Sequence, residues 1–174
     1  MILGRVKICC DGGVMRDIQG FTLIELMVTI AVLAVIAMMA APSFNNTLTN
    51  QKLKQTLVEV KSGLAEARSR AMLTRSNTIL CPNKSDSGVS ISQASCGANL
   101  GNYSTLSSSQ QTDSVLLAKI SDKVTIKSGS SLSFQFNSQG MSTEQKMTIC
   151  GANRSYIINV YIPGTISVTE ASSC

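Results

Sequence analysis

The most unusual chemical group in this chain is a single carboxylate beside a long apolar run. Residues 26–44 are apolar apart from Thr29 and Ser43, and Glu25 immediately precedes them. A carboxylate next to so apolar a segment is energetically costly unless it finds a partner of opposite charge. Glu25 is therefore a candidate for an ion pair with a functional role.

The apolar run is long enough to cross a membrane. A helix needs about 20 mostly apolar residues to span the hydrocarbon core of a bilayer, and no charged residue occurs between Glu25 and Lys52. We therefore expect a transmembrane helix over residues 21–44. The simpler interpretation of Glu25 is then a charge that is tolerated near the membrane interface.

The chain has six cysteines, of which Cys9 and Cys10 precede the apolar run. The four that follow it are Cys81, Cys96, Cys150 and Cys174. Four cysteines can pair in three ways. The pairs 81–96 and 150–174 are preferred, because each closes a local loop of about 15 to 25 residues and is worth about 3 kcal/mol. Disulfides predict an oxidising compartment, whereas the alternative, a zinc site, lacks histidine and Cys-x-x-Cys spacing.

The composition gives little support for catalysis. Histidine is absent, which removes the commonest general base and the commonest metal ligand. The sequence also lacks a Gly-x-Ser-x-Gly elbow, a phosphate-binding loop and a clustered pair of carboxylates. We therefore expect neither an enzyme, nor a metal site, nor a cofactor.

The positive charge of the chain is modest. Fifteen basic residues face ten acidic ones, a net charge of +5, and such an excess indicates nucleic-acid binding only where the bases cluster. Four lysines of the C-terminal half could form such a patch, although lysines at this spacing more often line the solvated face of a sheet. They are Lys119, Lys123, Lys127 and Lys146.

Apolar periodicity continues beyond the run and predicts that the helix does not end at the membrane. Pro42 should kink or locally unwind it; the alternative is that Pro42 simply ends it. Beyond Pro42, apolar residues recur mostly three or four apart, as on one face of an amphipathic helix. These residues are Phe44, Leu48, Leu53, Leu57, Val60, Leu64, Ala67 and Ala71. We expect one helix from about residue 22 to about residue 74.

Short β segments follow the helix. Residues 83–114 are rich in Ser, Asn, Gly and Gln and are expected to form a long surface excursion. Alternating apolar residues and turn signals predict the strands: 77–81 (stopped by Pro82), 115–120, 124–126, 132–136, 147–150, 155–162 and 165–169. In 132–136, Leu132, Phe134 and Phe136 should point inward. The expected fold class is α+β, a long N-terminal α-helix packed on an antiparallel β-sheet domain at residues 75–174.

The residues Gly20-Phe-Thr-Leu-Ile-Glu25-Leu are very similar to the class III signal sequence of type IV pilins and type II secretion pseudopilins. The resemblance implies that prepilin peptidase cuts after Gly20 and methylates the new N-terminal residue, Phe21. Residues 1–20 would then be a leader peptide, and Met15, which gives the short leader MRDIQG, is the preferred start. In this family the residue at the position of Glu25 pairs with the N-terminal amine of a neighbouring subunit.

Residues 75–174 resemble the minor pilins and pseudopilins of the FimT, FimU and GspH type. That likeness rests on strand order, on Phe134-x-Phe136 and on the cysteine positions. It implies a single-pass protein of the bacterial inner membrane, with a periplasmic C-terminal domain. Such a protein later joins other minor and major pilins and helps to initiate or assemble the type IV pilus. The alternative is a GspH-type pseudopilin of a type II secretion system.

A third possibility is a pilus-associated receptor for DNA uptake. Some proteins of the FimT group bind DNA through a basic Gly-Arg motif in their C-terminal region. At the matching place this chain reads Ile162-Pro-Gly-Thr-Ile-Ser167, without Lys or Arg, and the nearest base is Arg154. Because phosphate contacts depend on Lys and Arg, this departure argues against DNA as a partner.

Overall fold

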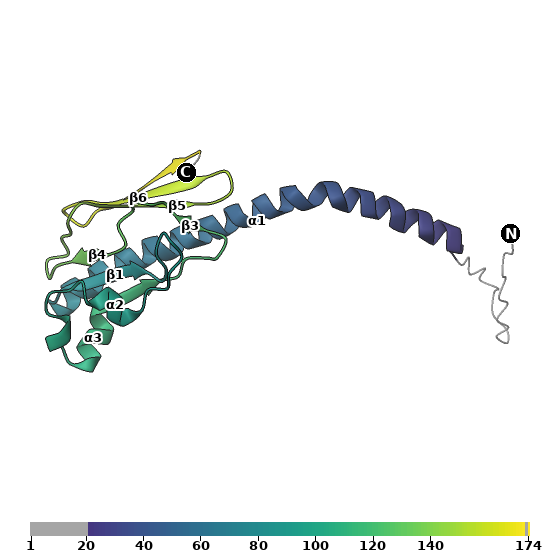
Figure 1. Ribbon diagram of the computed structural model, residues 1–174. Coiled ribbons are helices and arrows are strands. Elements are labelled where there is room, and N and C mark those ends of the chain that lie inside the picture. The colour runs from purple at the N-terminus through teal and green to yellow at the C-terminus, as the bar shows by residue number, and fades with distance from the viewer. Residues whose placement is uncertain (1–20, 173) are drawn as a thin grey trace, which may run out of the picture. The chain divides into compact units, whose positions relative to one another are not determined.

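A computed structural model describes residues 21–172 and 174, apart from the side chains of residues 39–43. The chain divides into two compact units, residues 1–44 and residues 45–174, and helix α1 (Leu23–Thr74) contributes residues to both (Figure 1). The expected leader, with its start residue and Gly20, lies outside the described residues.

Helix α1 matches the predicted helix over residues 22–74 to within one residue. Its backbone is helical through Pro42, so the alternative in which Pro42 ends the helix is wrong, and the backbone does not unwind there. The predicted kink stays a prediction. The helix stops after Thr74 because Arg75 takes a left-handed conformation with φ of 51°, a common way to end a helix.

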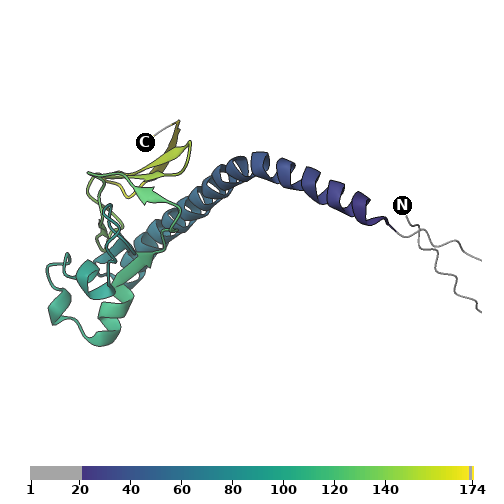
Figure 2. The same ribbon diagram turned by 45° about the vertical axis from the view of Figure 1, so that its right-hand side comes forward.

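The described strands of the second unit form two sheets (Figures 1 and 2). The first has the order β2-β1-β4 and the second has the order β3-β5-β6-β7. The strands of the first sheet are β1 (Thr78–Pro82), β2 (Val115–Ala118) and β4 (Phe134–Phe136). Those of the second, which is antiparallel throughout, are β3 (Thr125–Ile126), β5 (Gln145–Cys150), β6 (Ser155–Val160) and β7 (Ile166–Ala171).

The expected α+β class is confirmed, with one difference in topology. Strands β1 and β2 are parallel, with Ile79 opposite Val115, whereas a wholly antiparallel sheet was expected. Parallel strands need a crossover connection, and residues 83–114 supply it. Pro82 also differs from expectation, because it is the last residue of β1 rather than the residue that stops it.

The crossover lies largely exposed, as expected of a surface excursion, but it contains short helices that were not predicted. It contains α2 (Gln93–Gly97), the short helix η1 (Tyr103–Thr105) and α3 (Ser108–Ser114). Both α-helices begin with a capping box, Ser92 with Ser95 and Ser107 with Gln110. These reciprocal hydrogen bonds satisfy backbone groups that the first turn of a helix leaves unpaired, so even sequences this polar can start a helix.

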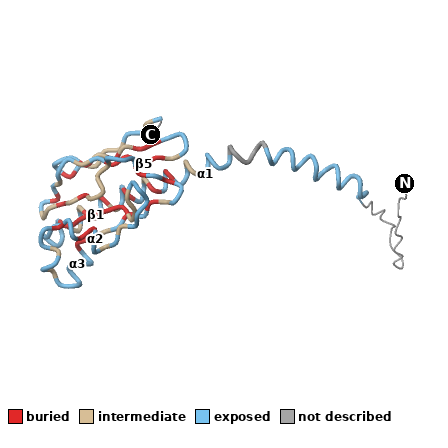
Figure 3. Tube along the Cα trace, in the orientation of Figure 1, coloured by how far each residue is buried: buried red, intermediate tan, exposed pale blue. Residues whose placement is uncertain are grey.

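One face of α1 packs against the strands and forms the main hydrophobic core. The buried helix residues Leu53, Val60, Leu64, Ala67 and Ala71 share a cluster with residues of both sheets, including the fully buried Phe134 and Phe136. Burial is concentrated in this unit (Figure 3).

Two members of the predicted apolar helix face are not in this core. Phe44 and Leu48 are 65% and 37% exposed, so the prediction that they share one face of the helix with Leu53 and the later apolar residues was wrong.

Candidate functional site

The first turn of α1 is capped by a side chain. The Thr22 hydroxyl accepts a hydrogen bond from the backbone N–H of Glu25 at 3.3 Å, and the Thr22 carbonyl accepts one from Leu26 at 3.1 Å. Glu25 thus lies in the first helical turn, where the helix dipole favours a negative charge. The role of Thr22 was missed, although Thr22-x-x-Glu25 is the sequence signature of a capping box.

The charge of Glu25 has no counter-ion in the described part of the chain. The three ion pairs found among the described residues all involve other groups. Glu25 and Phe21 are both exposed, Phe21 at 85%. The carboxylate is therefore accessible to a cation supplied from outside the described residues.

The surface around Glu25 is apolar on all sides of the helix. The large apolar side chains from Phe21 to Met38 range in exposure from 53% at Val32 to 85% at Phe21. The hydroxyl of Thr29 donates to the carbonyl of Leu26 at 2.8 Å, so this polar group is satisfied within the helix. A continuous exposed apolar surface of this kind marks a site of contact with membrane or protein.

Among the described residues, no helix is both long and apolar enough to cross a membrane.

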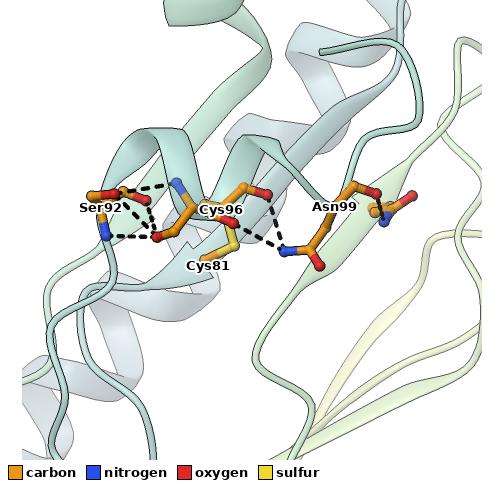
Figure 4. The surroundings of a disulfide bond; sticks show 6 residues. Cys81, Ser92, Cys96 and Asn99 are labelled. Carbon is orange, nitrogen blue, oxygen red and sulfur yellow. Dashed lines mark hydrogen bonds between the residues drawn. A yellow bond between two sulfur atoms is a disulfide. The ribbon is translucent and has the colours of Figure 1, made fainter. Parts of the chain in front are cut away.

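The structure contains the two disulfides that the sequence favoured. Cys81 is joined to Cys96, with their Cα atoms 6.0 Å apart, and Cys150 to Cys174, with theirs 5.9 Å apart. The first lies in a second hydrophobic cluster beneath α2. Figure 4 shows it beside Asn99, whose side-chain amide donates to the Cys96 carbonyl at 3.1 Å. The disulfide between Cys81 and Cys96 fixes the crossover on β1. The disulfide between Cys150 and Cys174 ties the C-terminus to the end of β5.

Family comparisons match two regions of the chain. Residues 15–41 match the prokaryotic N-terminal methylation motif, and residues 58–164 match the type II transport protein GspH. The second match covers more than half of the chain. The chain belongs to the GspH family. No curated protein and no solved structure matches it.

Membership of this family, together with the methylation motif, makes the chain a type IV pilin-like protein or pseudopilin. Proteins of this kind are structural rather than catalytic. The family also implies processing by prepilin peptidase, association with other pilins and membrane-anchored assembly at the surface.

The described residues of this GspH-family chain offer no cluster for a metal ion. No group of three or more His, Cys, Asp or Glu residues that could hold a metal ion occurs among the described residues. A depression of about 420 Å³ beside α1 is lined by Lys52, Glu59, Lys119 and Asp122, among others. Lys52 donates to the Gln55 side chain at 3.1 Å, and Asp122 pairs with Lys84 at 3.8 Å, so this surface is a mixed polar one.

The lysines considered for DNA binding do not line one surface depression. Lys119 lines the depression beside α1, whereas Lys127 and Lys146 line another, of about 260 Å³, on the four-stranded sheet. Arg154, the nearest base in sequence to the 162–167 loop, forms an ion pair with Glu170 at 3.0 Å.

The fold brings a different base to the 162–167 loop. Arg68 of α1 is half-buried, and its Nη2 donates to the Pro163 carbonyl at 2.9 Å. Gly140 and Gly164 pack against the same guanidinium at positive φ, 74° and 75°. Arg68 therefore joins two turns to the helix, and no local sequence signal could have found a contact across 95 residues.

Proposed function

We propose that this chain is a minor type IV pilin. It is anchored in the bacterial inner membrane by residues 21–44 with its C-terminal domain in the periplasm, cleaved after Gly20 and N-methylated at Phe21 by prepilin peptidase. It then joins other minor and major pilins and helps to initiate or assemble the pilus. The observation that carries this proposal is the exposed apolar helix surface with one carboxylate, Glu25, in its first turn, inside the matched methylation motif.

The proposed role of Glu25 follows from the chemistry of cleavage. Cutting after Gly20 creates a free amine on Phe21, a cation that the precursor lacks at this position. In a medium of low dielectric constant this amine and a carboxylate attract strongly, while either charge alone is costly. Glu25 has no counter-ion among the described residues, so it can bind the amine of a neighbouring subunit and fix the register between the two.

The exposed apolar surface has two successive environments in this proposal. In the membrane it is covered by lipid, and in the fibre it is covered by neighbouring helices. The head, residues 75–174, then presents its surface at or near the end of the fibre. The disulfides fit this location, since they persist in an oxidising compartment such as the periplasm.

A second candidate function is a pseudopilin of a type II secretion system. The observation in its favour is that the family match is to the type II transport protein GspH. Deletion of the chain distinguishes the two: loss of surface pili with normal protein secretion supports the minor pilin, and the reverse supports the pseudopilin. Neighbouring genes give the same distinction: pilus genes beside this gene favour the minor pilin, and secretion genes favour the pseudopilin.

The processing step is tested by mass spectrometry of the protein isolated from its host. We expect a mature chain that begins with methylated Phe21, and we expect Gly20→Val to remain uncut because the peptidase accepts little bulk before the scissile bond. Gly101→Val is the matched control, since a Cβ at Gly101 meets open space. Normal cleavage of the Gly20 variant, or a mature N-terminus elsewhere, would contradict the proposal. The precursor mass also shows whether translation starts at Met15.

A further inference from the structure

The face of α1 opposite the core carries a second regular pattern. Eight uncharged residues occur at alternating spacings of three and four, and all eight are exposed; Val58 is 66% exposed and Met72 is 44% exposed. We call this set the outer seam. It consists of Leu48, Gln51, Gln55, Val58, Ser62, Ala65, Ser69 and Met72.

The spacing of the outer seam is that of a coiled coil. An average of 3.5 residues per repeat keeps the same face turned toward a parallel helix over many turns. The head packs on the other side of α1, through Leu53, Val60 and Leu64. It leaves the outer seam exposed from Leu48 to Ser69, and at the end of the seam Met72 lies against Gly140. A partner helix can therefore lie along residues 48–69 without displacing any part of the core.

Charged residues flank the outer seam in the order that a coiled coil requires. One flank carries Glu59 and Glu66, preceded by Lys52, and the other carries Lys54 and Lys61, followed by Arg68, which is bound to the head. In a parallel, in-register pair, each residue of the second flank meets the residue five positions later on the other helix. Lys54 then faces Glu59 of a second copy, and Lys61 faces Glu66 of a second copy. Lys52 and Arg68 would face the uncharged Thr47 and Leu73 of the other helix. An antiparallel pair would instead bring the two lysine flanks together.

The pair of Lys54 and Glu59 is the clearest of these contacts. Neither residue belongs to an ion pair found among the described residues, whereas Glu66 is already bound to Arg70 at 2.7 Å. The two-fold symmetry of a dimer uses each contact twice. The charges are therefore complementary to those of an identical helix.

We propose that the outer seam binds a second copy of this chain as a parallel, in-register two-helix coiled coil. The parallel direction rests in part on the proposed function, because two chains anchored in one membrane by their N-terminal helices extend to the same side. Few seam residues are large and apolar, so the dimer is weak and reversible. Such a dimer leaves the N-terminal helix surface and Glu25 available for assembly.

Cysteine cross-linking of the full chain in host membranes tests the proposal. In a Cys9→Ser/Cys10→Ser background, Ser62→Cys and Ser69→Cys place a thiol in the outer seam opposite the same residue of the second copy. We expect both to shift the chain from monomer to dimer on a non-reducing gel. Ser109→Cys on α3 is the matched control, exposed but away from the seam, and should remain monomeric. A monomer in both seam variants, or cross-linking to a different protein, overturns the proposal.

Charge reversal tests the register. Lys54→Glu in the Ser62→Cys chain turns two attractive contacts into repulsive ones and should weaken dimerisation on the order of tenfold. Adding Glu59→Lys should restore it, which a general loss of folding would not allow. An unchanged dimer with Lys54→Glu, or no rescue by the second change, contradicts the register. Cleavage after Gly20 is measured in the same strains. A chain that is cleaved but stays monomeric overturns the dimer proposal alone. A chain that is not cleaved overturns the proposed function.

Discussion

At the scale of single residues, Glu25 is placed by two independent influences. The helix that Thr22 caps favours a negative charge in its first turn, and the apolar surface around it makes that charge costly without a partner. The first influence is local and is satisfied in one chain. The cost of the charge beside the apolar surface is relieved only by a cation from outside the described residues. Glu25 is therefore a candidate for a role in assembly rather than in folding.

Gly164 provides a residue-scale prediction about the head. Its φ of 75° is strained for a residue with a side chain, and a Cβ there would collide with the Gly140 carbonyl and the Arg68 guanidinium. We expect Gly164→Ala to lower the free energy of unfolding by about 2–4 kcal/mol, of which about 1 comes from the backbone conformation and the rest from the collision. Urea unfolding of the chain in detergent measures this.

The matched control is Gly129→Ala. Gly129 has a similar φ of 80°, but a Cβ there has nothing within 4 Å, so only the backbone cost of about 1 kcal/mol should appear. Equal losses for the two variants would show that the contact among Gly140, Gly164 and Arg68 contributes nothing to stability.

At the scale of elements, the sequence predicts best where a pattern repeats. The long helix and the seven strands were located to within a few residues, because apolar periodicity and turn residues mark them. The helices of the crossover were missed because α2 and α3 together have few apolar residues and depend on capping. Ser107-x-x-Gln110 is a capping signature that could have revealed α3.

Helix α1 also shows how periodicity can mislead. Its two stripes, the core face and the outer seam, both use spacings of three and four, so spacing alone does not tell them apart. Leu48 belongs to the outer seam, and the next apolar residue, Leu53, belongs to the core. The interval of five between them breaks the pattern, and it is the only local sign that the sequence passes from one stripe to the other.

The two disulfides provide a prediction at this scale. Cys81 and Cys96 are 1% and 0% exposed, whereas Cys174 is exposed. Because thiol–disulfide exchange needs access to a sulfur atom, limited treatment with dithiothreitol should open the bond between Cys150 and Cys174 first. Alkylation followed by peptide mass spectrometry follows both bonds in one sample. Reduction in the opposite order would show that the second hydrophobic cluster does not protect the bond beneath α2.

At the scale of the whole molecule, the two units differ in how far they bury their apolar side chains. Residues 45–174 bury a core of their own, whereas the described side chains of the first unit are exposed and almost all apolar. One unit buries a core of its own, and the other leaves its described apolar side chains exposed. This division, which the apolar run already indicates in the sequence, fits a subunit that is stored in a membrane and used in a fibre.

The most direct test of the proposed function is the incorporation of Glu25 variants into filaments. Pili, or pseudopili, are sheared from host cells, and the amount of this chain in them is measured by immunoblotting. We expect Glu25→Ala and Glu25→Gln to be cleaved normally and yet to be lost from the filament fraction, because both lack the carboxylate. Glu144→Ala, a change at an exposed loop residue of the head, should enter filaments as the native chain does. Normal incorporation of both Glu25 variants would contradict the account.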